Sequence, residues 1–108
     1  NFSQSYATCQ SLGMKMLAIV TLEDFNQLTE FSKLTFSVGS TLKLDGEKAA
    51  NGTWFIKTPA VVPLYSAAVP ALTETTGPCL LIKRFSVEMN LYLGVSCEQG
   101  SWTFCEYV

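Results

Sequence analysis

The residues best suited to do chemistry are four cysteines, which stand at Cys9, Cys79, Cys97 and Cys105. No two of them form a Cys-x-x-Cys pair, the spacing typical of zinc sites and of thioredoxin-like redox motifs. Four cysteines suit either buried free thiols in a reducing compartment or two disulfides in an oxidising one. Four cysteines can pair in three ways, and counting alone does not choose among them.

Two N-glycosylation sequons favour the oxidising compartment. The triplets Asn1-Phe2-Ser3 and Asn51-Gly52-Thr53 both match the acceptor pattern Asn-x-Ser/Thr. Asn1 and Asn51 are therefore candidate glycosylation sites. Together with the even cysteine count, they predict a secreted protein or the extracellular part of a membrane protein. The first residues lack the basic and apolar regions of a signal peptide, so we expect that any secretion signal is not included in this chain.

The sequence contains no recognisable catalytic constellation. It has no histidine, which excludes His-based triads, His-ligated zinc and pH switching through imidazole. The neighbouring carboxylates Glu23 and Asp24 have no partner that would divide general-acid and general-base roles between them. The same holds for Asp45 and Glu47. We therefore predict that the chain is not an enzyme and uses no cofactor.

Composition predicts a single small domain that does not bind nucleic acid. The 108 residues are 48% hydrophobic and 15% charged, which suits one domain (1–108) with one core. A net charge of −2 with scattered Lys and Arg does not suit a surface that binds the phosphate backbone of a nucleic acid. The longest apolar stretch, 60–72, is interrupted by Pro63 and Pro70 and is shorter than the roughly 20 residues of a membrane helix. We expect no membrane insertion of this domain.

Two helices are predicted in the first third of the chain. Apolar residues recur at helical spacing over 2–12, and Gly13 is placed to end this helix in a left-handed conformation. Thr21 and Asp24 have the spacing of a capping box, so a second helix should begin after Thr21. Its apolar stripe predicts an end near Lys33.

After the second helix the period of the apolar residues changes to two, which is typical of strands. Residues 34–38 alternate apolar and polar side chains and predict a half-buried strand. Asp45-Gly46 and Asn51-Gly52 are both hairpin-type turn signals. Further strands are predicted at 53–56, 79–87, 91–95 and 102–105, with an irregular loop over 57–78 that carries all four prolines. Helices followed by antiparallel strands predict an α+β fold.

Five segments follow one another in a familiar order. Phe2 stands seven residues before Cys9, at a place where Trp is usual, and "CQSLGMKMLAIVTLEDFNQL" (9–28) is similar to a Cys-x-x-x-Gly … Leu-Ala … Ser-x-Glu-Glu passage into a second helix. "FSVGST" (36–41) resembles a Trp-Ile-Gly-Leu strand, with Ser37 and Ser40 as departures, and "NGTWFI" (51–56) resembles the strand that follows it. "CEQGSWTFCEY" (97–107) is similar to a closing Cys … Phe-Ile-Cys-Glu. In this order the segments resemble the C-type lectin-like domain family over nearly the whole chain.

The resemblance implies a fold of two helices, antiparallel sheets, a long loop and two disulfides. The implied pairings are Cys9–Cys105 and Cys79–Cys97. The first would join the first helix to the last strand, and closing so long a loop restricts the unfolded state by roughly 4–5 kcal/mol. Family members usually begin with a strand that pairs with the last one, whereas this chain begins at a helix. We therefore expect either that residues before Asn1 are missing or that the last strand keeps an unpaired edge.

The resemblance also allows the family's calcium sites to be checked position by position. Calcium takes about 6–8 oxygen ligands, and sugar binding in the family depends on it. The two ligand motifs correspond here to Val69-Pro70-Ala71 and Tyr92-Leu93-Gly94, and the acidic positions before Cys79 hold Gly77 and Pro78. Because Val, Ala, Leu and Gly stand where the ligands would be, we predict that the sugar-binding calcium site is absent.

A second calcium position of some family members corresponds to Thr21, Glu23, Gln27 and Glu106, of which two are carboxylates. Thr21 and Glu23 could equally cap the second helix while Glu106 is solvated, and this is the interpretation we prefer. The prediction is therefore no metal site, with these four residues as the remaining candidates.

The long loop has lost the family's polar ligands but remains apolar and rich in proline. Some of its apolar side chains could bury against the domain, or part of the set could stay exposed as a protein-contact patch. We predict contacts through Leu64 and Tyr65, with Lys83, Arg84 and Tyr92 as the neighbouring rim. In the family the same loop can exchange between protomers, so a homodimer through this loop is a further expectation.

The resulting hypothesis is an extracellular recognition module that binds a protein ligand or glycoprotein without calcium-dependent sugar binding. One alternative is a lectin that contacts glycans independently of calcium, through Trp, Tyr and polar side chains. Another is a structural or self-associating secreted domain. The sequence does not separate the first two.

Overall fold

The first helix begins and ends where local sequence signals predict. The computed structural model describes residues 1–57, 60–66, 72–87 and 89–107, and in it α1 spans Phe2–Ser11. The Asn1 side chain accepts a hydrogen bond from the Gln4 backbone N–H at 3.0 Å, and the Gln4 side chain bonds back to Asn1. Gly13 follows the helix with a φ of +72°, the left-handed conformation that favours glycine.

The second helix, α2, spans Leu22–Thr35 and starts at the predicted capping box. The Thr21 side chain accepts from the Asp24 N–H at 3.1 Å, and the Asp24 carboxylate accepts from the Thr21 N–H at 3.2 Å. The predicted strand over 34–38 is wrong, because Leu34 and Thr35 belong to this helix and a turn follows it. Residues 36–40 of "FSVGST" accordingly form the connection to the next strand, which begins at Thr41.

Among the described residues, most strands form one sheet of seven, in the order β4-β3-β2-β6-β7-β5, with β8 paired to β2. Its neighbours run antiparallel except for the pairs β5–β7 and β2–β8, which run parallel. The strands are β2 (Thr41–Lys48), β3 (Trp54–Ile56), β4 (Val62–Pro63), β5 (Leu72–Thr75), β6 (Cys79–Arg84), β7 (Asn90–Val95) and β8 (Trp102–Thr103). The fold is therefore α+β, as predicted.

The two Asp/Asn-Gly signals have different outcomes. Asn51-Gly52 lies in the turn between β2 and β3, where Gly52 has a φ of +88° and the Ala49 N–H donates to the Thr53 carbonyl at 2.8 Å. Asp45-Gly46, predicted as a second turn, instead lies inside β2, where the register with β6 shifts between Lys43 and Glu47. A Cβ at Gly46 would lie 2.7 Å from a methyl carbon of Leu80, so glycine serves close packing here.

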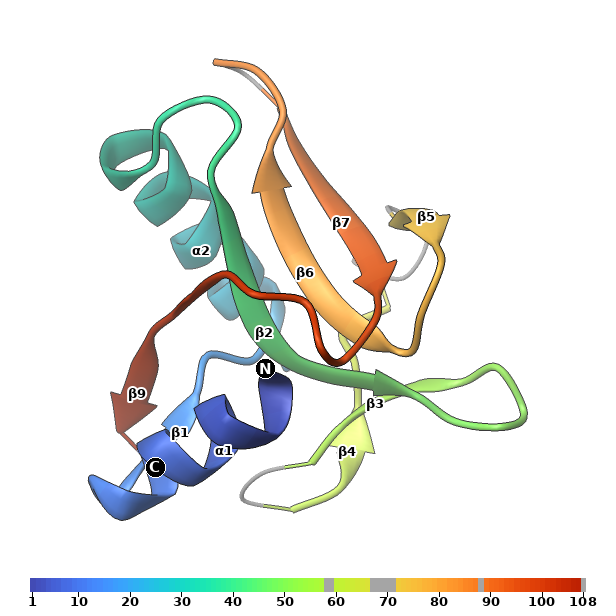
Figure 1. Ribbon diagram of the computed structural model, residues 1–108. Coiled ribbons are helices and arrows are strands. Elements are labelled where there is room, and N and C mark those ends of the chain that lie inside the picture. Colours follow the sequence, from blue (N-terminus) through green and yellow to red (C-terminus); the bar gives the residue numbers. More distant parts are fainter. Residues whose placement is uncertain (58–59, 67–71, 88, 108) are drawn as a thin grey trace.

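A separate two-stranded sheet joins β1 (Met14–Met16) to the last strand, β9 (Cys105–Tyr107). Met14 pairs with Tyr107 and Met16 with Cys105, in antiparallel register. One edge of the last strand therefore pairs with β1, the short strand that follows the first helix. Figure 1 shows α1 beside β1 and β9, while α2 runs alongside the larger sheet.

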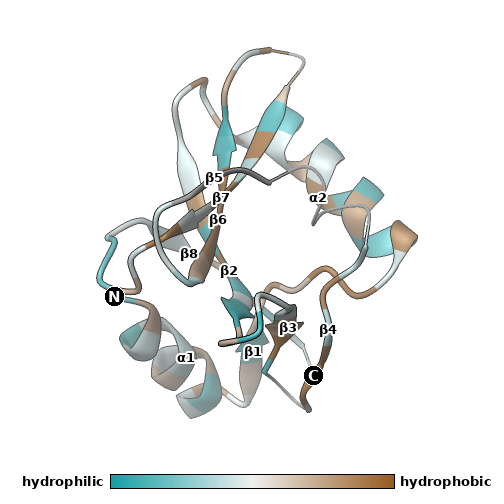
Figure 2. Cartoon of the chain, turned by 90° about the vertical axis from the view of Figure 1, so that its right-hand side faces the viewer, coloured by the Kyte–Doolittle hydropathy of each residue, from teal (hydrophilic) through white to brown (hydrophobic). Residues whose placement is uncertain are grey.

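In the described ranges, two clusters of buried side chains make up the core. One lies between α2 and the larger sheet and includes Leu28, Leu44 and Ile82; the other includes Phe2, Met16 and Leu81 beneath α1. Both helices interleave hydrophilic and hydrophobic residues, as expected for helices that bury one face (Figure 2). Neither helix in the described part of the chain has the length and apolar character needed to cross a membrane.

Both implied disulfides are present. Cys9 joins Cys105 with the Cα atoms 5.5 Å apart, and Cys79 joins Cys97 with the Cα atoms 5.2 Å apart. The first bridge fixes α1 to β9, and the second fixes the start of β6 to the segment after β7. All four half-cystines belong to or pack against the second core cluster.

Candidate functional site

The positions equated with the sugar-site calcium ligands hold no side-chain oxygen where the structure describes them, apart from Tyr92. Leu93 is 9% exposed and belongs to the core. Gly94 lies against the Trp54 ring, which would be 3.0 Å from a Cβ at this position. A Cβ at Gly77 would lie 2.3 Å from the backbone of Val95, so a carboxylate side chain has no room there. Val69 and Ala71 lie outside the described residues.

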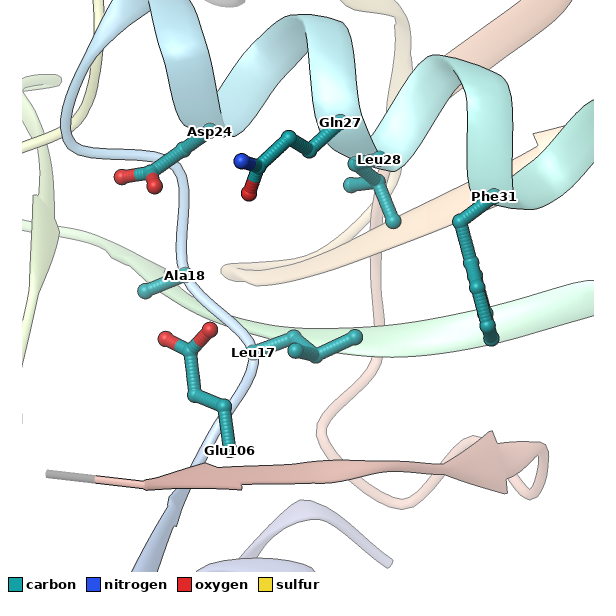
Figure 3. A pocket seen from close by; sticks show the side chains of 7 residues that line it. All are labelled: Leu17, Ala18, Asp24, Gln27, Leu28, Phe31 and Glu106. Carbon is teal, nitrogen blue, oxygen red and sulfur yellow. The ribbon is translucent and has the colours of Figure 1, made fainter.

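Two of the remaining calcium candidates, Gln27 and Glu106, line a pocket of about 130 Å³ between α2 and β9. Figure 3 shows the side chains of Asp24 and Gln27 projecting from α2 and that of Glu106 projecting from β9 toward them, with Leu17 and Ala18 between. Thr21 and Glu23 do not line this pocket. The residues that line it are Leu17, Ala18, Asp24, Gln27, Leu28, Phe31 and Glu106.

Each polar candidate has a partner within the protein. Thr21 caps α2 together with Asp24, and Glu23 accepts a hydrogen bond of 3.1 Å from the Gln27 side chain. The Glu106 carboxylate forms an ion pair with Lys15, which stands opposite it in the register of β1 and β9. The arrangement therefore gives these oxygens capping and ion-pairing roles.

A cluster of metal-ligand type occurs in the described ranges at Glu47, Cys79 and Cys97, where one atom of each side chain lies within 4.8 Å of the others. The two sulfurs are bonded to each other as a disulfide, so neither is a thiolate ligand.

The loop residues predicted to contact a partner pack onto the first core cluster. Leu64 is 4% exposed, and its N–H donates to the Trp54 carbonyl at 3.3 Å. Tyr65 is partly buried: its N–H donates to the Ile19 carbonyl at 3.0 Å, and its ring lies 5.9 Å from that of Phe25. Leu64 is therefore part of the core, as the alternative of local packing predicts, and is not an exposed contact residue.

The predicted rim is also largely buried. Tyr92 is 2% exposed and stacks on Phe25 with ring centroids 5.9 Å apart, and burial raises the pKa of Tyr92 to about 12. Arg84 is 7% exposed, and its guanidinium donates to the carbonyls of Ser32, Phe36 and Val87 at 2.6, 3.1 and 3.0 Å. Arg84 thereby ties the end of α2 to the β6–β7 hairpin. Lys83 is partly exposed.

A group of aromatic residues lies elsewhere, where the end of α2 meets β8 and the residue after it; three of its members are exposed, and Phe36 is partly buried against the first core cluster. Its members, which we call the aromatic surface, are Phe31, Phe36, Trp102 and Phe104. The Phe31 ring lies 5.7 Å from Phe36 and 5.5 Å from Phe104, in edge-to-face arrangements. Trp102 is 69% exposed. Leu34, which lies between Phe31 and Phe36 in the sequence, is 85% exposed.

A shallow pocket of about 240 Å³ opens on the aromatic surface. Aromatic and hydroxyl side chains line it: Thr35, Phe36, Ser37, Ser40, Trp102 and Phe104. The sequence signals that overlap this surface are the apolar alternation over 34–38, which predicts a half-buried strand, and the predicted last strand over 102–105. The apolar residues were identified correctly, but their exposure depends on tertiary contacts that local alternation does not encode.

Comparison with known proteins adds no family. No protein-family model matches the sequence, and no curated protein matches it as a relative.

Proposed function

We propose that this chain is an extracellular recognition domain with a C-type lectin-like fold, which binds a protein partner without calcium-dependent sugar binding. The fold part of the proposal is supported by two helices, antiparallel strand pairs and the disulfides Cys9–Cys105 and Cys79–Cys97. The order of sequence motifs supports the same fold. Two disulfides and two sequons support an oxidising, extracellular compartment.

The observation that carries the binding function is the aromatic surface. Large apolar side chains gathered on an exposed face are typical of protein interaction sites, and Trp is among the residues most enriched at binding hot spots. Trp102 has most of its surface open, and it lies beside Phe36 and Phe104 at the same pocket. We therefore propose the aromatic surface as the contact site in place of the predicted contacts Leu64, Arg84 and Tyr92, whose side chains are buried.

The proposal is tested by screening the purified domain against a panel of secreted and cell-surface proteins in the presence of EDTA. A partner should bind without calcium, and Trp102→Ser should weaken binding by about 30-fold or more, the loss typical of a hot spot. Leu12→Ser is the matched control, since Leu12 is 64% exposed at the far end of α1. Equal binding by both variants and the parent protein would argue against this surface.

Calcium-independent glycan binding is a second candidate, and the lining of the pocket favours it. The hydroxyls of Thr35, Ser37 and Ser40 accompany the Trp102 ring, and the lining carries no charged side chain. Such a mixture of side chains suits a neutral sugar ring, which has an apolar face and polar hydroxyl edges. A glycan array run with EDTA distinguishes the two: Trp102-dependent glycan capture with no protein partner would support this second function.

A further inference from the structure

We infer that Glu47 protects the Cys79–Cys97 disulfide against reduction by negatively charged thiols. The three side chains meet where β2 and β6 run side by side. Glu47 and Cys79 are partners in the antiparallel register of these strands, so their side chains lie on the same face of the sheet. A carboxylate oxygen of Glu47 and the two disulfide sulfurs all lie within 4.8 Å of one another.

The more exposed half-cystine of the pair lies within range of this charge. Cys79 is 3% exposed, whereas Cys97 is partly exposed. The side chain of Glu47 is 32% exposed. A thiol that reaches Cys97 from the solvent therefore approaches a carboxylate at a separation where Coulomb repulsion between like charges is substantial.

The chemistry of reduction is sensitive to such a charge at both ends of the bond that breaks. An external thiolate attacks the Cys97 sulfur, the Cys79–Cys97 bond breaks, and Cys79 leaves as a thiolate that takes a proton from water. A second external thiolate then attacks the external sulfur of the mixed disulfide, which releases Cys97 as a thiolate and the reductant as its own disulfide. Two electrons pass from the external thiols to the protein. Glu47 disfavours the incoming anion and the anionic leaving group alike.

Lys57 sets the strength of the effect. Its Nζ lies 3.3 Å from a Glu47 carboxylate oxygen and 4.2 Å from the centre of the Tyr6 ring. The ammonium therefore offsets part of the Glu47 charge. Loss of Lys57 should strengthen the protection, whereas loss of the Glu47 charge should remove it.

The second disulfide provides an internal reference. Among the residues that the structure describes, no carboxylate lies as close to both sulfurs of Cys9–Cys105 as Glu47 does to those of Cys79–Cys97. Its reduction should therefore depend little on either Glu47 or Lys57.

The test is the rate at which the intact, folded protein loses the Cys79–Cys97 bridge at low ionic strength, followed by rapid alkylation and peptide mapping. The reductants are three thiols of different charge: glutathione, 2-mercaptoethanol and cysteamine. Glu47→Gln should accelerate reduction by glutathione about fivefold, as expected for one charge at this range in a water-like environment. Lys57→Gln should slow the same reaction. Glu30→Gln, which removes one exposed carboxylate from α2, should leave the rate unchanged.

The pattern across thiols separates electrostatic protection from a loosened structure. The acceleration in Glu47→Gln should be largest with glutathione, smallest with cysteamine, and should shrink as salt is added. An acceleration equal for all three thiols, or accompanied by equally faster reduction of Cys9–Cys105, would overturn the inference. An unchanged rate of reduction in Glu47→Gln would also overturn the inference, as would a faster rate in Lys57→Gln. The Lys57 variant tests the same charge if the Glu47 variant does not fold.

Discussion

The hydroxyl of Tyr6 on α1 donates a hydrogen bond of 2.7 Å to the carboxylate of Asp45, which is fully buried in β2. The same carboxylate oxygen accepts from the Lys57 backbone N–H at 3.1 Å. One buried acid therefore connects the first helix, the central strand and the start of the long loop. Because a buried carboxylate needs its hydrogen bonds, these segments are held in register by Asp45.

Replacing Tyr6 by Phe tests this connection. The variant keeps the ring but removes a donor to a buried carboxylate, which should lower the free energy of unfolding by about 1.5–3 kcal/mol. Tyr107→Phe is the control, since Tyr107 is 86% exposed and should change stability by less than about 0.5 kcal/mol. Urea unfolding of the three proteins measures both values. Equal stability of Tyr6→Phe and the parent protein would contradict the assigned role.

Alkaline pH should destabilise the protein through two tyrosines. Burial, followed by the hydrogen bond to Asp45 and the nearby carboxylates, raises the pKa of Tyr6 far above its ordinary value, and burial raises that of Tyr92 to about 12. The stabilisation from each group is complete below the pKa of the unfolded chain, near 10, and is lost as pH rises above it. For each tyrosine the decline starts near pH 10 and steepens toward a limit of about 1.4 kcal/mol per pH unit, reached where the unfolded side chain is ionised and the folded one is not.

The contribution of Tyr6 to this decline can be isolated. In Tyr6→Phe, the free energy of unfolding measured by urea between about pH 9 and pH 11 should fall less steeply than in the parent protein, since one of the two groups no longer titrates. Parallel curves for the two proteins would mean that Tyr6 does not link stability to pH.

The features predicted well from sequence are those set by neighbouring residues. The capping box of Thr21 with Asp24 and the left-handed Gly13 involve contacts within a few residues, so spacing alone identifies them. The prediction failed where distant residues decide. Residues 34–35 continue α2 because Arg84, far along the chain, donates to the carbonyl groups at the helix end.

The same reasoning explains the other differences. Asp45-Gly46 has the local signature of a turn, but Tyr6 and Lys57 hold Asp45 within a strand, and Leu80 packs against Gly46. At the candidate site, the disulfide pairing followed from the resemblance. The aromatic surface did not, because exposure of an apolar side chain is decided by which elements cover it.

Leu64 provides a direct test of loop packing against loop exposure. Leu64→Ala should lower the free energy of unfolding by about 2–5 kcal/mol, since the side chain is 4% exposed within the first core cluster. Leu34→Ala makes the same chemical change at a side chain that is 85% exposed and should cost less than about 0.5 kcal/mol. Urea unfolding distinguishes the two. A small effect at Leu64 would restore it as a candidate contact residue.

Calcium should not stabilise the protein. The two carboxylates that line the pocket between α2 and β9, on Asp24 and Glu106, already accept hydrogen bonds from the α2 cap and from Lys15. Leu93 and Gly94 contribute no side-chain oxygen. A ligand present at 100 times its dissociation constant would add about 2.7 kcal/mol, which raises the melting temperature by several degrees in a domain of this size. We expect the same melting temperature in millimolar calcium and in EDTA, measured by scanning fluorimetry. An upward shift that Glu106→Gln abolishes would instead place a calcium site in the pocket between α2 and β9.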